Sequence, residues 1–426
     1  MKALALYASG QAILTGEDPV QTQKLDAHQR PLDEAAKVEE GIANPRSLSA
    51  ELDVTVFDTM APLEKDWRAL ELDNLTSLHQ GYDWCHSWVG AYRRPLAILR
   101  GVCGPESAFI LPVEIERSHG VRIAKFIGAN HSNINTGLFT EHFLRRAVDL
   151  DAHCFAESLR HALRGKADLL LLQNIPLEWR GQKSPLGLLP LVQNQNHAYQ
   201  LPLLENFEAT LRQLNSKSRR KKFRVQSKRL EAIGGFDYVA GGTAGQQHAF
   251  LDQFFAQKAE RFKALGLPDV FADAETRTFL HGLIDIREGD DFGLEMHAIR
   301  LKGENEGHIA ALSGISRKGD HVICQFSSIN ESIAADASPG EFLFWQMISK
   351  LHGTGVTLFD FGLGDQVYKR SWAPIETDHH DIVLPLSFVG RIAGLAHRAI
   401  TRSKAHIKAR PGLYKFAQRA RSKIGV

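Results

Sequence analysis

The chain has 426 residues, of which 43% are apolar and 23% charged, and its net charge is +2. At roughly 100–200 residues per domain, this length predicts two or three domains, and the composition excludes a collagen-like, largely disordered or disulfide-stapled protein. No stretch approaches the ~18 uncharged apolar residues of a membrane span, and the apolar run at the start is too short for a signal peptide. The four cysteines are far apart and never in CxxC spacing, which is typical of reduced thiols. We therefore expect a soluble, cytoplasmic protein.

Residues 1–50 are predicted to be a flexible leader. Most of this segment, residues 15–50, has few large apolar residues, no aromatic residues and three prolines. Such a segment cannot bury enough surface to offset the entropy lost when a chain becomes ordered. We expect the folded part to begin near Leu52.

The first half of the folded part, residues 51–205, contains the pattern of one α/β unit. Two helices are followed by three strands rich in β-branched and apolar residues, then by a helix and a continuous apolar run suited to a buried strand. In chain order, these predicted elements cover residues 61–73, 82–93, 96–103, 108–116, 121–128, 143–164 and 168–174.

The second half, residues 206–390, repeats this order of elements. A basic helical segment and an amphipathic helix precede three strands, a helix and a buried strand. These elements cover residues 207–235, 248–265, 293–302, 306–317, 320–329, 341–353 and 356–362. The two halves share a pattern and not a sequence, so the pattern predicts two tandem α/β (α+β) units of similar plan.

The basic tail, residues 391–426, contains ten Lys and Arg and no Asp or Glu, which leaves a net charge of −8 for residues 1–390. Apolar residues recur between these cations in the pattern of a basic amphipathic helix broken at Pro411. This pattern favours a solvated helix docked on the body. The alternative is contact with a membrane surface or an acidic partner, which would place the protein peripherally at the inner membrane.

The predicted helix at 341–353 starts directly after a strand and a small turn that contains Gly340. The first N–H groups of such a helix have no internal partners and lie at the positive end of the helix dipole. Ser338, Gly340 and Glu341 are therefore candidates for holding a pyrophosphate. An ordinary buried crossover helix is the alternative.

The segment LFDFGLGDQVYKRSWAP, residues 358–374, carries the densest group of chemically useful side chains. A buried strand ends in Asp360, a Gly-x-Gly turn follows, and a short helix then carries Tyr368 and Lys369. Ligands of α/β sheets gather at the carboxyl ends of strands. A phenol can protonate a leaving thiolate and an ammonium can pair with a phosphate, so this segment favours function over a helix cap with surface charges.

Two further segments are candidates for substrate binding. Arg220 and Arg224 share one face of a predicted helix that is rich in cations, and like charges at this spacing repel. An acidic substrate, a nucleotide phosphate or RNA would explain the clustering, and a solvated face is the alternative. His131 and Asn133 lie in a polar loop between strands, which is typical of a binding loop or of Asx turns.

Several chemistries have no motif here: there is no GxSxG, HExxH, EF-hand loop, P-loop or GxGxxG after a strand. The 19 histidines are scattered along the chain. We therefore predict no metal site.

The second half resembles a known family. The segments LRQLNSKSRRKKFRVQSKRLEAIGG, HIAALSGI, SPGEFLFWQMISKLHGTG and FDFGLGDQVYKRSW are similar to the GNAT-superfamily acetyltransferase domain of CelD-like proteins, which are associated with cellulose and exopolysaccharide biosynthesis and related to FemAB-type aminoacyltransferases. The first half matches more loosely through YDWCHSWVGAY, ILPVEI and FIGANHSNINTGLF. The usual Q/R-x-x-G-x-G/A phosphate signature is missing, and residues 335–340 take its place.

The resemblance implies two tandem GNAT-like folds with mixed sheets flanked by helices. It implies acyl transfer from acetyl-CoA or another acyl-CoA to an amine or hydroxyl of a small-molecule or saccharide acceptor. The pyrophosphate would bind at residues 338–341, and Tyr368 would protonate the departing thiolate. Because no Cys or Ser has a recognisable nucleophile setting, we expect direct transfer, with Asp360 or Asp365 as the base or acceptor-orienting carboxylate.

Two alternatives stay open. FemAB-type relatives use aminoacyl-tRNA, and the cationic helix at 217–229 would suit such a donor. A transferase fold without activity, retained as a scaffold of a polysaccharide synthase and docked through residues 391–426, is the non-enzymatic alternative.

Overall fold

The computed structural model describes residues 51–104, 106–330, 332–408 and 410. The predicted leader and the tail beyond residue 410 lie outside the described residues. The elements of the first half are β1 (Leu52–Phe57), η1 (Ala61–Leu63), α3 (Glu64–Glu71), η2 (Leu78–Gln80), α4 (Tyr82–Tyr92), β2 (Ile98–Cys103), β3 (Glu106–Leu111), β4 (Val113–Ser118), β5 (Val121–Phe126), β6 (Leu138–Phe139), α5 (Glu141–Arg146), η3 (Ala147–Asp149), α6 (Ala152–Ala162), β7 (Leu169–Pro176), β8 (Glu178–Trp179), β9 (Gln182–Lys183), η4 (Pro185–Leu188) and β10 (Leu191–Pro202).

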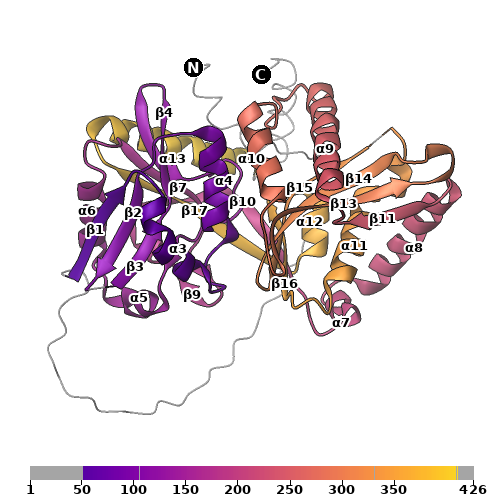
Figure 1. Ribbon diagram of the computed structural model, residues 1–426, viewed down its shortest axis with the longest axis horizontal. Coiled ribbons are helices and arrows are strands. Elements are labelled where there is room, and N and C mark those ends of the chain that lie inside the picture. The colour runs from indigo at the N-terminus through magenta and orange to yellow at the C-terminus, as the bar shows by residue number, and fades with distance from the viewer. Residues whose placement is uncertain (1–50, 105, 331, 409, 411–426) are drawn as a thin grey trace, which may run out of the picture.

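The second half follows the same plan on the other side of the molecule (Figure 1). Its elements are α7 (Phe207–Arg212), α8 (Ser216–Ala232), β11 (Phe236–Ala240), α9 (Ala244–Ala264), α10 (Ala274–Ile284), β12 (Arg287–Glu288), β13 (Asp291–Leu301), η5 (Gly303–Asn305), β14 (Ile309–Lys318), β15 (His321–Ile329), η6 (Ala335–Ala337), α11 (Pro339–Leu351), β16 (Leu358–Leu363), α12 (Val367–Trp372), β17 (Ile375–Pro385) and α13 (Phe388–Lys408).

Two predicted elements of the first half are divided in the structure. The strand expected at 108–116 is broken at Pro112 into β3 and β4, because proline has no N–H to donate to a ladder. The helix expected at 143–164 is divided into α5 and α6. Asp151 begins the second of these by accepting a hydrogen bond from the Cys154 N–H at 2.8 Å, which is the geometry of a helix N-cap.

The described strands form one 11-stranded mixed sheet, a smaller sheet of four strands, β1-β2-β3-β6, and a two-stranded sheet, β8-β9. The order of the large sheet is β11-β13-β14-β15-β16-β10-β17-β7-β5-β4, with β12 paired to β13. At its centre, β10 of the first half pairs with β16 of the second, and β17 of the second half pairs with β7 of the first. The last strand of each half therefore joins the other half into one continuous sheet.

Each half contains a strand, a helical crossover and a parallel neighbouring strand. In the first half, β5 and β7 pair in parallel at only two positions. In the second, β15 and β16 pair in parallel from His321–Leu358 to Ile323–Asp360, and both strands then continue without pairing to each other. Each pair of strands therefore diverges toward its carboxyl end. We call the opening between β15 and β16 the second-half cleft.

Aromatic packing joins the helices of the two halves. Phe279 of α10 makes edge contacts with Trp84 and Trp88 of α4, at ring-centroid distances of 5.0 and 4.9 Å. All three side chains are buried. Such aromatic pairs add to the stabilisation that burial itself provides, so the two halves are held together by a hydrophobic core as well as by the shared sheet.

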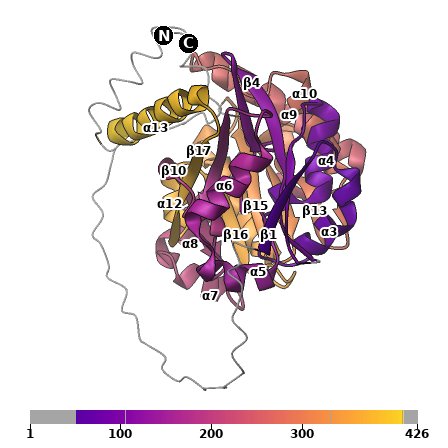
Figure 2. The same ribbon diagram turned by 90° about the vertical axis from the view of Figure 1, so that its left-hand side faces the viewer.

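The helix α13 lies along the outer side of β10 and β17 (Figure 2). The face of α13 that packs on the body carries small residues. A larger residue would not fit at Gly390, since a Cβ added there would lie 1.6 Å from the Asp168 carbonyl oxygen. The part of the basic tail within the described residues is thus a helix docked on the body. No helix within the described ranges combines the length and the apolar character that crossing a membrane requires.

Candidate active site

The start of α11 presents two backbone N–H groups without partners. Ser338 is the N-cap residue, has a left-handed backbone (φ 48°), and makes no side-chain capping bond. Pro339 follows at the first helical position and has no N–H, and the first amide bonded back to the cap is that of Phe342. Within the described part of the chain, the amides of Gly340 and Glu341 make no hydrogen bond. Both point out of the positive end of the helix, where an anion is stabilised.

Cations from α8 surround this helix start. Glu341 is paired with Arg219 at 3.1 Å and with Lys222 at 2.5 Å. Arg229 donates a hydrogen bond to the carbonyl oxygen of Asp336, two residues before Ser338. Three cations therefore lie close to the start of α11. Of the two carboxylates near it, Glu341 and Asp336, Glu341 is already paired with two of these cations. This electrostatic setting favours a bound phosphate.

The structure brings Tyr368 of α12 to the same place. Its partly buried ring stacks on Phe344, one turn into α11, with centroids 5.4 Å apart and planes inclined by 18°. Burial raises the pKa of the Tyr368 phenol well above its usual value, the Cys324 thiol acts in the same direction, and the Ser327 hydroxyl opposes it. The phenol is therefore protonated at neutral pH, as a proton donor must be.

Asp360 lies at the closed end of the second-half cleft, away from α11. Its side chain is fully buried and accepts hydrogen bonds from Gln200 Nε2 at 2.8 Å and from the Gly362 N–H at 2.7 Å. Burial by itself would raise the pKa of Asp360, but His321, whose Nε2 lies 3.7 Å from the carboxylate, and the donor from Gln200 hold it below its usual value. Asp360 pairs with Ile323 of β15. Six further residues of β15, roughly 20 Å of strand, separate Ile323 from the end of β15.

Asp365 follows β16 and is held by three donors from two elements, β10 and α13. It accepts hydrogen bonds from His197 Nδ1 at 3.1 Å, Tyr199 Oη at 3.0 Å and Lys408 Nζ of α13 at 2.6 Å. Burial opposes ionisation, but the hydrogen bonds from His197 and Lys408 hold the pKa of Asp365 far below its usual value. A carboxylate with a low pKa is a weak base. The role of general base that the sequence predicts for Asp360 or Asp365 stays a prediction.

Lys369 does not reach the surface. Its ammonium donates hydrogen bonds to the carbonyl oxygens of Gly362 at 3.2 Å and Leu363 at 2.6 Å, inside the second-half cleft. Burial lowers the pKa of Lys369 to about 8. Lys258 of α9, which the sequence did not single out, also has its pKa lowered to about 8 by burial.

The loop between β5 and β6, residues 127–137, fills the opening between β5 and β7 in the first half. Asn135 donates from its backbone N–H to the Asn174 carbonyl oxygen at 2.9 Å, and from Nδ2 to the Gln173 carbonyl oxygen at 2.8 Å. These bonds occupy the backbone of β7 where its pairing with β5 has ended. The first-half opening is therefore closed by the chain itself, whereas the second-half cleft is flanked by a cavity.

That cavity, of about 130 Å³, lies between the two halves, and we call it the interdomain cavity. It is lined by Trp84, Asn130, His131, Ser132, Asn133, Val270, Phe271, Phe279, Leu280, Leu283, Gln325 and Phe326. No Lys, Arg, Asp or Glu is among these residues, and burial lowers the pKa of His131 to about 4, so the lining is neutral. The Nε1–H of Trp84, a residue that is 4% exposed, has no hydrogen-bond partner within the described ranges.

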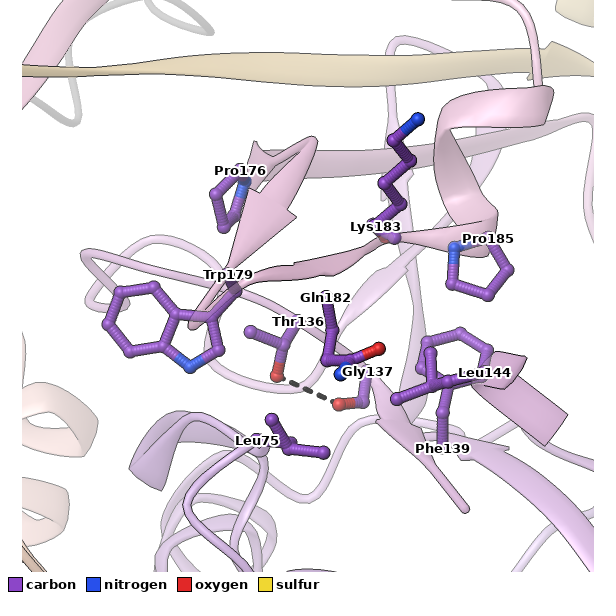
Figure 3. Close-up of a pocket in the computed structure, with 11 residues that line it drawn as sticks. Leu75, Thr136, Gly137, Phe139, Leu144, Pro176, Trp179, Gln182, Lys183 and Pro185 are labelled. Atoms are coloured by element: carbon purple, nitrogen blue, oxygen red, sulfur yellow. Dashed lines mark hydrogen bonds between the residues drawn. The ribbon is translucent and has the colours of Figure 1, made fainter. Parts of the chain in front are cut away.

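A second, smaller cavity of about 30 Å³ lies within the first half (Figure 3). Trp179 lines it, and the Nε1–H of this residue also has no partner among the residues described. Nearby, Thr136 donates a hydrogen bond from Oγ1 to the Gly137 carbonyl oxygen at 2.8 Å. The size of this smaller cavity suits about one or two water molecules. None of its lining residues comes from the second half.

The predicted substrate residues fall into two separate groups. Asn133 donates from Nδ2 to Gln325 Oε1 at 3.3 Å, so it and His131 lie at the cleft. Arg220 and Arg224 lie on α8, on the far side of the second half (Figure 1). Arg220 is paired with Glu208, and Arg224 is exposed. The structure therefore brings together residues 338–341 with Tyr368, places His131 and Asn133 in the cavity wall, and leaves the two arginines apart.

Residues 217–370 match a family model described as an acetyltransferase (GNAT) domain. The match, over about a third of the chain, lies within the second half and supports a transferase enzyme. Within the described ranges, no cluster of three His, Cys, Asp or Glu side chains could hold a metal ion. No curated protein sequence matches the chain.

Several solved structures superimpose on much of the chain. FemX superimposes with a TM-score of 0.52 at 12% identity, over 74% of this chain and 95% of its own. L-PGS from Bacillus licheniformis has a TM-score of 0.45 at 10% identity, over 74% of this chain and 96% of its own. A tandem GNAT protein from the clavulanic acid biosynthesis pathway has a TM-score of 0.42 at 9% identity, over 79% and 99%. The predicted α/β fold class, with mixed sheets flanked by helices, is confirmed by the described topology and by the superposition on FemX.

Proposed function

We propose that the protein transfers an acyl group, in the first instance acetyl, from acyl-CoA to an amine or hydroxyl of a saccharide precursor of the cell envelope or an exopolysaccharide. One observation carries this proposal: the unpaired amides of Gly340 and Glu341 lie beside the Tyr368 ring at the open end of the second-half cleft. The CelD-like resemblance of the sequence supports the saccharide pathway.

The donor would be held by the second half. The pyrophosphate of CoA would accept hydrogen bonds from the amides at the start of α11, with Lys222 and Arg229 close by to offset its charge. The thioester would then enter the cleft between β15 and β16, where neither strand pairs with the other beyond Ile323 and Asp360. Ser338 would contribute through its backbone, because its side chain makes no capping bond and is exposed.

The acceptor would be held in the interdomain cavity. Aromatic side chains and a neutral lining with amide and imidazole groups suit an uncharged, hydroxylated ring. Trp84 offers an N–H, and Asn133 and Gln325 offer amides, so hydroxyl groups of the acceptor would find both donors and acceptors. A cavity of this size accommodates one small unit and not a polymer chain.

The chemistry would be a direct transfer. The acceptor nitrogen or oxygen attacks the thioester carbonyl carbon, the carbon–sulfur bond breaks, and Tyr368 gives its proton to the leaving thiolate while the acceptor loses one. Asp360 and Asp365 would position the backbone after β16, and either remains a candidate for the proton acceptor. Holding the two reactants in line supplies most of the rate enhancement in such a mechanism.

A tRNA-borne aminoacyl donor is the second candidate, and one observation favours it. Lys217, Lys221, Arg224 and Lys228 form an exposed stripe on α8 and make no ion pair with any described residue. A stripe of unpaired cations along one helix face is typical of nucleic-acid contact. Under this alternative, Arg220 and Arg224 would bind the donor and not the acceptor.

A thermal-shift screen separates the two candidates, because a ligand that binds the folded state raises the unfolding temperature by mass action. We expect stabilisation by acetyl-CoA or a longer acyl-CoA, and none by aminoacyl-tRNA. Stabilisation by aminoacyl-tRNA alone, abolished when Lys221 and Arg224 are changed to Gln, would replace the first candidate with the second.

A further inference from the structure

The first turns of α13 carry large apolar side chains that face away from the protein. Phe388, Val389, Ile392 and Leu395 are 75%, 47%, 57% and 68% exposed. We call these four residues the α13 apolar patch. The opposite face of the helix is fixed against the sheet by Gly390 and its neighbours, so the patch cannot turn inward. Exposed apolar residues gathered on one helix face mark an interaction surface.

Cations surround the α13 apolar patch. Arg391 and Arg402 are exposed on the same helix, and Arg164 and Lys166 are exposed in the turn before β7. This turn lies beside the helix, because the carbonyl oxygen of Asp168 contacts Gly390. No ion pair involves any of these four cations within the described ranges.

Two carboxylates close to the start of α13 are already paired. Asp168 is paired with Arg122 at 3.1 Å, and Glu157 with Arg160 at 2.6 Å. Moreover, no Asp or Glu follows Asp381 in the sequence. Among the described residues, the surface around the patch therefore carries unpaired cations, and these two carboxylates are paired with other cations.

We propose that the α13 apolar patch docks on the surface of a bilayer that contains anionic lipids. The apolar side chains would enter the boundary between headgroups and acyl chains, and the surrounding cations would contact the headgroups. A second copy of the chain is a poor occupant, because a symmetric contact would bring the same cations against each other. Four side chains also form too small a patch for a stable protein interface. This proposal does not depend on the acyl-transfer function.

Co-sedimentation of the full-length protein with vesicles tests the proposal. We expect binding to vesicles of phosphatidylcholine with phosphatidylglycerol, weak binding to phosphatidylcholine alone, and a decrease in binding with rising salt. Changing Ile392→Ser and Leu395→Ser together should lower the partition coefficient by at least about tenfold. The matched controls are Leu72→Ser and Val148→Ser, which change side chains that are 84% and 83% exposed elsewhere and should have no effect.

A second pair of variants tests the charges. Neutralising Arg391 and Arg402 to Gln should lower binding to the anionic vesicles about fivefold for each charge, whereas neutralising Arg224 and Lys228 on α8 should not. The proposal is overturned if the full-length protein does not bind anionic vesicles, or if the α13 variants bind as well as the controls. It is also overturned if sedimentation velocity shows a dimer that the α13 variants dissociate while vesicle binding is unchanged.

Discussion

Asn133 and Gln325, which are 192 residues apart in the sequence, are joined by a hydrogen bond of 3.3 Å from Nδ2 to Oε1. Gln325 lies on β15 just after its pairing with β16 has ended, and Asn133 belongs to the loop that closes the opening of the first half. The same amide oxygen of Gln325 lies 3.2 Å from His79 Nε2. One loop of the first half therefore forms a wall of the site in the second half. In the proposed function, the second half holds the donor and the first half helps to select the acceptor.

The unpaired indole of Trp84 gives the first prediction. Changing Trp84→Phe removes the buried, unpartnered N–H of a residue that lines the interdomain cavity, and we expect the KM for the acceptor to rise about tenfold if the acceptor takes up this donor. Acyl-CoA binding should be unchanged. The matched control is Trp179→Phe. The Nε1–H of Trp179 is also unpartnered among the described residues, but Trp179 lines the cavity of the first half (Figure 3). Equal effects of the two substitutions would contradict an acceptor role for Trp84.

Tyr368→Phe should lower kcat by about a hundredfold to ten-thousandfold, the range typical of a lost general acid. The acyl-CoA dissociation constant should stay the same, because the ring and its stacking on Phe344 are kept. Steady-state kinetics with calorimetry separates the two effects. As a control, Tyr238→Phe removes a partly buried phenol of the same half, hydrogen-bonded to His297 Nδ1 at 2.7 Å. A comparable loss of kcat there would show that Tyr368 has no special role.

Gly340→Val should raise the KM for acyl-CoA by at least about tenfold, because loss of the two amide hydrogen bonds weakens anion binding. A Cβ at this position would lie 2.9 Å from Ile329 Cγ2 and would displace the helix start. Gly245→Val is the control, since Gly245 holds the same second position of α9 with nothing within 4 Å of its added Cβ. If Gly340→Val leaves the KM unchanged, the start of α11 does not hold the donor.

The free energy of unfolding should fall as the pH falls from about 6.5 to about 4. Burial lowers the pKa of His79, His131 and His379 from 6.5 to about 4. In this window the unfolded chain binds protons that the folded chain does not, which costs about 1.4 kcal/mol per pH unit for each such group. Urea unfolding at pH 7 and pH 5 measures the loss.

His379→Leu should reduce that pH dependence. Its ring is fully buried, and neither ring nitrogen has a hydrogen-bond partner within the described ranges, so leucine leaves no new polar group unpaired. The control His142→Leu, at an exposed position of α5, should keep the full dependence. An unchanged difference between pH 7 and pH 5 in His379→Leu would mean that this residue does not contribute.

The local elements of the fold could be predicted from the sequence, whereas its central pairing could not. The strands at 293–302 and 320–329 and the helix at 341–353 have strong local patterns and appear as β13, β15 and α11. By contrast, β10 is rich in polar residues, among them Gln193, Gln195 and His197, and so lacks the apolar pattern of a buried strand. Its partners β16 and β17 are more than 150 residues away in the sequence. Pairing over such distances depends on tertiary contacts that no local pattern encodes.

Part of the candidate site could likewise be predicted from the sequence, and part could not. Residues 338–341 and Tyr368 are brought together because a strand, a helix and the next parallel strand are adjacent in both sequence and space. The roles of Trp84 and Gln325 could not be predicted, because they depend on where α4 of the first half meets β15 of the second. The sequence predicts a helix at residues 82–93 that carries Trp84. An aromatic residue in such a helix is normally a core residue, and nothing local distinguishes an indole that lines a cavity.

Calorimetric titration of the wild-type protein with acetyl-CoA tests the central claim most directly. We predict saturable binding with one site per chain, weakened by salt because cations of α8 surround the start of α11. Absence of heat and of any stabilisation with acetyl-CoA and with longer acyl-CoAs would contradict the claim that this helix start holds the diphosphate of an acyl donor.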